Sequence, residues 1–155
     1  MNAPAIIVYS LDQATAALSA AEGCNRDILI LSPPDAAASM GAGVFRALVD
    51  LVREEFPEAS FTAALGCGDN AGHALAAIRQ GIKALVLADD CPARQRVADI
   101  ARQHGARLLS TDVYGGLGDH SNIKPPLDLM ESPDPLAACR GFLHTEAAAP
   151  LPEQP

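Results

Sequence analysis

The chain alternates between short apolar runs and longer segments in which apolar residues recur every three or four positions. Most of the short runs are continuously apolar, which is typical of strands buried on both faces of a parallel sheet. We predict five strands, at residues 5–9, 27–31, 60–65, 84–87 and 107–109. The periodic segments between them predict helices, at about 11–22, 44–56, 71–80 and 92–104.

Glycine and proline residues stand where these elements would begin or end. Gly23, Gly81 and Gly105 follow helical segments, where a left-handed residue commonly ends a helix. Pro57 would stop the second helix, and Pro92 suits the first turn of the fourth. Strands and helices that alternate in this way form a parallel sheet with right-handed crossovers.

Two α/β architectures can be built from such units. We predict a single doubly wound five-stranded parallel sheet, flavodoxin-like in its order 2-1-3-4-5, which would close its core within residues 1–110. A complete (β/α) barrel needs eight units, more than the chain provides. The alternative is a half (β/α)-barrel that dimerises, because pairing with a second copy would cover its open sheet edge.

The unit at residues 61–90 resembles pieces of aldolase-type barrels. It consists of a strand, a glycine-rich turn, a helix and a second strand that ends in Asp89-Asp90. The unit has neither a Schiff-base lysine nor a metal-binding histidine at the matching place, so the resemblance implies no activity.

Residues 111–155 differ in composition from the rest of the chain. They contain seven of the 12 prolines, and seven acidic residues against two basic ones. This composition predicts a Pro/Gly-rich acidic tail with one short helix at 133–144 and a disordered end from Ala147 onward. Such a tail would wrap the domain, contact a partner or close over a site as a lid.

Composition also excludes several classes of partner. The net charge of −8 and the lack of clustered Lys and Arg along the sequence argue against nucleic acid. The apolar runs are too short to cross a membrane. The first residues contain neither a basic segment nor a cleavage pattern, which predicts a cytoplasmic protein. The four cysteines form no C-x-x-C pair, so we expect reduced thiols and no metal site built from them.

The predicted sheet order places a binding site at the carboxyl ends of its strands. Ligands bind there where the strand order reverses, which for 2-1-3-4-5 lies between the loops after the first and third strands. Ser10 would then face the turn from Gly66 to Gly72. The predicted ligand-binding residues are Ser10, Ser32, Gly66, Cys67, Gly68, Asp69, Asn70, Gly72, Asp89 and Asp90.

The chemistry of this turn leaves the ligand open. A glycine-rich turn before a helix can bind phosphate through backbone amides, but its spacing is neither a dinucleotide fingerprint nor a P-loop. Several aspartates follow the strand ends at the same edge; they repel anions and favour hydroxyl groups, amines or Mg²⁺. The glycines can equally serve a tight turn, and the aspartates can equally cap helices. We expect a small polar ligand and no particular cofactor.

Two candidate catalytic residues lie in the turn. Cys67, at a strand end before a helix, could act as a thiolate nucleophile, or it could simply pack in the core. Asp69 could bind Mg²⁺ together with Asp89 and Asp90. Either chemistry would make the protein an enzyme, and the sequence does not decide this. A third hypothesis is an oligomeric scaffold or partner-binding domain.

Overall fold

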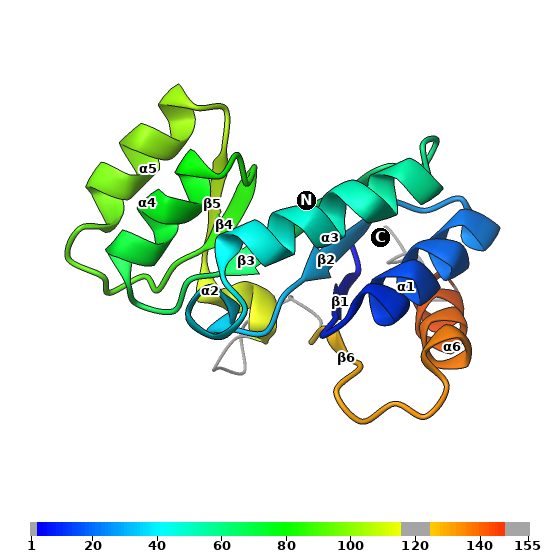
Figure 1. Cartoon of the computed structure of the whole chain (residues 1–155). Helices are drawn as coiled ribbons and strands as arrows, with labels where there is room; N and C mark the ends of the chain where they lie inside the picture. The colour runs from blue at the N-terminus through cyan, green and yellow to red at the C-terminus, as the bar shows by residue number, and fades with distance from the viewer. Residues whose placement is uncertain (1–2, 116–124, 148–155) are drawn as a thin grey trace, which may run out of the picture.

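The computed structural model describes residues 3–115 and 125–147. Within them the chain forms one open sheet of six parallel strands in the order β5-β4-β3-β2-β1-β6 (Figure 1). The strands are β1 (Ala5–Ile7), β2 (Ile28–Leu31), β3 (Phe61–Gly66), β4 (Ala84–Val86), β5 (Arg107–Leu109) and β6 (Leu127–Asp128). The helices are α1 (Leu11–Cys24), α2 (Ala36–Ser39), α3 (Ala42–Glu55), α4 (Ala71–Arg79), α5 (Arg94–Gln103), the 3-10 helix η1 (Thr111–Tyr114) and α6 (Pro135–Ala147).

The predicted parallel α/β sheet is confirmed, but the flavodoxin-like order 2-1-3-4-5 is wrong. That order places β1 between β2 and β3, whereas β1 pairs with β2 on one side and with β6 on the other. Strands β1 to β5 lie side by side in chain order. A local βαβ pattern looks the same whichever side of the sheet receives the next strand, so the sequence pattern could not distinguish the two orders.

The connecting helices cover one face of the sheet. Right-handed crossovers that always step in the same direction place every helix on the same side. The helices contact one another in the spatial order α6, α1, α3, α4 and α5 (Figure 1). Beneath them, alternate strand residues and the inner helix faces form the main core, which includes Ile6, Leu18, Ile30, Phe45, Leu65 and Leu85.

The other strand residues point to the opposite face, which is also apolar. Ile7, Leu31, Ala64, Ala84 and Val86 form a second buried cluster there. The η1 residues Val113 and Tyr114 pack against it, but within the described residues no α-helix does. The continuous apolar runs therefore predicted two apolar faces correctly, although in the described part of the chain α-helices cover only one of them.

Part of the tail belongs to this sheet and core. β6 pairs with β1, and α6, which packs on α1, occupies the region where the sequence predicts a short helix. Leu129, Cys139 and Leu143 are fully buried, and Arg26 Nη1 donates to the Leu143 carbonyl oxygen at 3.3 Å. The predicted disorder from Ala147 onward is wrong for Ala147, which ends α6, and otherwise lies outside the described residues. In the described part of the chain, no helix has the length and apolar character needed to cross a bilayer.

Candidate functional site

The crevice predicted between the loops after β1 and β3 does not exist in this sheet. β2 lies between the two strands, so Ser10 does not face the turn from Gly66 to Gly72. The Ser10 hydroxyl instead accepts a hydrogen bond from the Gln13 amide at 3.2 Å and caps α1. The geometry therefore gives Ser10 a local role at the start of the helix.

Ser32 and Gly66 form a buried joint between the ends of β2 and β3. Ser32 is fully buried; its hydroxyl donates to the Pro33 carbonyl oxygen (2.9 Å) and accepts from the Gly66 N–H (2.7 Å). The Tyr114 hydroxyl donates to the Ser32 carbonyl oxygen at 2.8 Å, and burial raises the pKa of Tyr114 above its ordinary value. These residues fasten η1 to the strand ends, and the Ser32 hydroxyl is shielded from a ligand in solution.

The turn after β3 uses its backbone amides within the protein. The Cys67 N–H donates to the Val86 carbonyl oxygen (2.8 Å) and the Gly68 N–H to that of Pro34 (3.2 Å). Gly68 has φ +58°, a left-handed conformation, and a Cβ there would collide with the Asp35 carboxylate. Glycine is therefore required at position 68 by the backbone conformation and by the close contact with Asp35. The N–H groups of Cys67 and Gly68, which a phosphate would need, already donate to carbonyl oxygens of the protein.

Cys67 is buried in the core, and only 2% of it is exposed. Its Sγ lies 3.6 Å from the Leu65 carbonyl oxygen, and burial raises the pKa of the thiol to about 12. A nucleophilic cysteine needs the opposite shift, because the thiolate is the reactive form. Nearby, the Asn70 side chain caps α4 by accepting from the His73 N–H at 3.0 Å. The geometry gives Cys67 a packing role and Asn70 a capping role.

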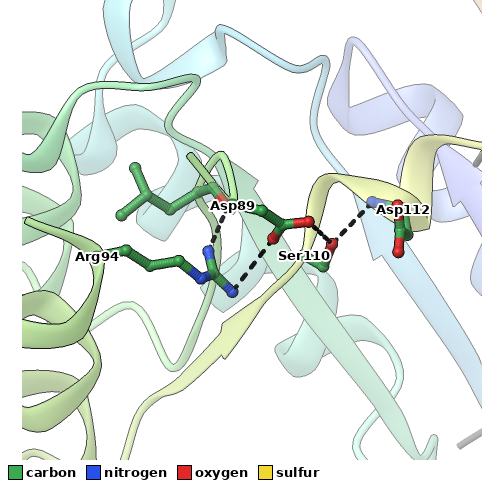
Figure 2. Close-up of polar contacts among 5 residues, drawn as sticks. Asp89, Arg94, Ser110 and Asp112 are labelled. Atoms are coloured by element: carbon green, nitrogen blue, oxygen red, sulfur yellow. Dashed lines mark hydrogen bonds and ion pairs between the residues drawn. The ribbon is translucent and has the colours of Figure 1, made fainter. Parts of the chain in front are cut away.

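Asp89 is the centre of an exposed polar cluster that joins the ends of β4 and β5 (Figure 2). Its carboxylate accepts from the Ser110 hydroxyl at 2.8 Å and lies 3.7 Å from the Arg94 guanidinium. Arg94 also donates to the Leu87 carbonyl oxygen, and the Asp112 N–H donates to the Ser110 hydroxyl at 3.2 Å. The Asp89 side chain remains 57% exposed, so its carboxylate is held in place and still accessible. Sequence reasoning selected Asp89 but missed Ser110, Arg94 and Asp112.

The other predicted site residues at this edge are exposed but not joined into an ion site. Asp69, Asn70, Gly72 and Asp90 all lie at the surface. Among the described residues, no three His, Cys, Asp or Glu side chains are placed to hold a metal ion. Asp69, Asp89 and Asp90 all belong to the described part, so the structure does not assemble the Mg²⁺ site considered above.

The junction of β1 with β6 holds a polar group that sequence reasoning missed. Gln13 Oε1 accepts from the Tyr9 N–H, and Gln13 Nε2 donates to the Leu129 carbonyl oxygen, both at 2.7 Å. Burial and the neighbouring Asp128 carboxylate raise the pKa of Tyr9 to about 12. The sequence Ser10-x-x-Gln13 matches a capping box, which could have indicated Gln13. No local pattern indicated that Asp128 would lie beside Tyr9.

The chain matches no protein-family model, and no curated protein is similar to it in sequence at a significant level.

Proposed function

We propose that the protein binds a small polar molecule, bearing hydroxyl or amine groups, at the carboxyl ends of β3, β4 and β5. The observation that carries this proposal is the Asp89 carboxylate, which Ser110 and Arg94 hold in place while its side chain stays 57% exposed. An ionised carboxylate has about four acceptor positions. The contacts with Ser110 and Arg94 leave acceptor capacity for a ligand.

The surrounding charge supports the chemical class of this ligand. Asp35, Asp69 and Asp90 in the loops, and Asp112 in η1, are exposed at the same edge of the sheet. Arg94 is engaged by Leu87 and Asp89. Clustered carboxylates repel anions and attract cations, and they accept hydrogen bonds from hydroxyl groups. We therefore favour an amine or a polyol over a phosphate.

A thermal-shift screen of polyols, amines and phosphates tests this proposal. We expect amines or polyols to raise the melting temperature of the wild type. For the best ligand, Asp89→Asn should weaken binding by about tenfold, since a hydrogen bond to a charged group contributes roughly 1.5 kcal/mol or more.

Asp99→Asn is the matched control, because Asp99 is similarly exposed (52%) and also pairs with an arginine, but on the surface of α5. It should leave the affinity unchanged. A screen in which only anions bind, or an equal loss in both variants, would overturn the proposal.

We also propose that two copies associate through the second face of the sheet. The observation that favours this is that, within the described residues, the α-helices pack on one face of the sheet while the other face carries a second apolar cluster. A cavity of about 360 Å³ lies on the other face, with Leu29, Leu109 and Val113 among its lining residues. A second copy would cover these partly exposed apolar side chains.

A further inference from the structure

A cavity of about 370 Å³ lies at the amino edge of the sheet, opposite the candidate site described above. It is bounded by α3, the start of β3, the loop before β4 and the first residue of β5. Its apolar lining includes Phe45, Val49, Phe61 and Ile82. This volume lies within the range of small-molecule pockets, and a mostly apolar wall with a few polar groups is typical of them.

Basic side chains surround this cavity. Arg46, Arg53, Lys83 and Arg107 line it, and among the described residues Asp50 is the one acidic residue that does so. These are four of only 11 basic residues in a chain with 19 acidic ones. They are scattered in the sequence, so no basic cluster is visible there; the fold brings them together. The cavity therefore carries a local positive charge in an acidic protein.

Most of this positive charge is not neutralised by acids. Arg46 pairs with Asp50 at 3.4 Å. Lys83 Nζ donates to the His104 carbonyl oxygen at 3.0 Å, and the Arg53 guanidinium lies over the Phe61 ring, 4.4 Å from its centroid. Within the described residues, Arg53, Lys83 and Arg107 form no ion pair.

We propose that this cavity binds a small organic oxyanion, a phosphate or carboxylate carried on an apolar ring. Lys83 and Arg107 would hold the anionic group, because guanidinium and ammonium donors form strong charge-assisted hydrogen bonds with such oxygens. The ring would pack against Phe61, Val49 and Ile82. This inference is independent of the function proposed at the carboxyl edge, since the two sites share no residue and favour ligands of opposite charge.

Phenyl phosphate is a suitable probe, because it combines a dianion with one apolar ring. Titrated into the ¹⁵N-labelled full chain, it should shift the amide resonances of Phe61, Ile82 and Lys83 and leave those of Asp89 and Ser110 in place. Inorganic phosphate has the anionic group without the ring, and benzyl alcohol has the ring without the anionic group. Both should bind more weakly than phenyl phosphate.

The double variant Lys83→Gln/Arg107→Gln should raise the Kd for phenyl phosphate by about tenfold or more, because it removes two charge-assisted contacts. Arg140→Gln removes an exposed charge on α6 and is the matched control, expected to leave the Kd unchanged. If the double variant loses its native amide spectrum, the two single variants replace it, each with a several-fold loss expected.

Three results would overturn the inference. The first is the absence of saturable shifts at the cavity residues with phenyl phosphate. The second is an unchanged Kd in the folded Lys83 and Arg107 variants. The third is equal affinity for phenyl phosphate and inorganic phosphate, which would show that the apolar wall takes no part. None of these bears on Asp89, so failure here and failure of the proposed function are distinguishable.

Discussion

Gly66 and Gly23 are glycines in regular elements, but their surroundings differ completely. A Cβ added at Gly66 would lie 2.5 Å from the carbonyl oxygens of Pro33 and Pro34 and 2.6 Å from the Tyr114 hydroxyl. A Cβ added at Gly23, within α1, would meet nothing within 4 Å. The space beside Gly66 is therefore already filled by backbone, which cannot move aside cheaply.

We predict that Gly66→Ala lowers the free energy of unfolding by about 1–3 kcal/mol, as overpacking does in well-packed interiors. Gly23→Ala, the control, should raise it by up to about 1 kcal/mol, because alanine favours the helix. Urea denaturation of both variants provides the measurement. A Gly66→Ala protein as stable as the wild type would show that the structure around Gly66 and Ser32 can accommodate a methyl group.

The buried thiol of Cys67 makes stability depend on pH in the alkaline range. Its pKa is raised from 9.0 to about 12 in the folded protein, so above about pH 9 the unfolded chain loses this proton while the folded chain keeps it. The unfolded state then binds fewer protons, and stability must fall as pH rises. The stabilising contribution is complete below pH 9 and is lost between pH 9 and 12.

We predict that the free energy of unfolding declines above pH 9, with Cys67 contributing up to about 1.4 kcal/mol per pH unit. Cys67→Ala should reduce this slope, whereas Cys24→Ala, which removes an exposed thiol, serves as the control. Urea titrations at a series of alkaline pH values measure the slopes. Identical slopes in the wild type and Cys67→Ala would contradict a buried, protonated Cys67.

Individual roles could be predicted where they depend on neighbours in sequence. Asn70 was predicted to bind a ligand, but its place just before an apolar helical segment is typical of a cap, which is the role it has at α4. The roles of Ser32 and Ser110 depend on partners 34 and 21 residues away, Gly66 and Asp89. Local sequence patterns carry no information about such pairs, so Ser32 was predicted to bind a ligand and Ser110 was overlooked.

At the scale of elements, periodicity predicted the five strands of residues 1–110, but not the sixth. β6 has two residues, Leu127 and Asp128, too few to show any alternation. It is held by backbone pairing with β1 and by the packing of the helix that follows it. The apolar pattern also could not predict the order of the strands, because each crossover is locally the same in the flavodoxin-like order and in the observed one.

The docking of α6 on α1 can be tested by a single truncation. Leu143, on α6, is fully buried, whereas Met130, in the loop before α6, is 62% exposed. We predict that Leu143→Ala lowers the free energy of unfolding by about 2–5 kcal/mol, through lost burial and the cavity left behind. Met130→Ala should change it by less than about 0.5 kcal/mol. Equal, small effects in chemical denaturation would show that α6 is not part of the cooperative core.

At the scale of the whole molecule, the loops at the carboxyl edge of the sheet are acidic, and one cavity at the amino edge is lined mainly by basic residues among its charged ones. Carboxylates follow the strand ends, and basic residues gather before the strands around the cavity lined by Lys83 and Arg107. The helix dipole, which favours bases at helix ends, accounts for Arg53 in the last turn of α3, whereas Lys83 and Arg107 lie outside the helices. The basic residues are scattered along the sequence, and only the fold shows four of them around one cavity.

The last prediction concerns the association of two copies through the apolar second face of the sheet. If two copies associate through it, the wild type should be a dimer at micromolar concentrations. Val113→Glu should then make it a monomer, because an unpaired carboxylate in an apolar interface costs several kcal/mol.

Leu51→Glu, the control, places the same charge on the opposite side of the molecule, on α3, where Leu51 is 49% exposed, and should leave the dimer intact. Size-exclusion chromatography with light scattering distinguishes these outcomes, with circular dichroism to confirm folding. A monomeric wild type, or equal dissociation by both variants, would mean that this face is not an interface between copies.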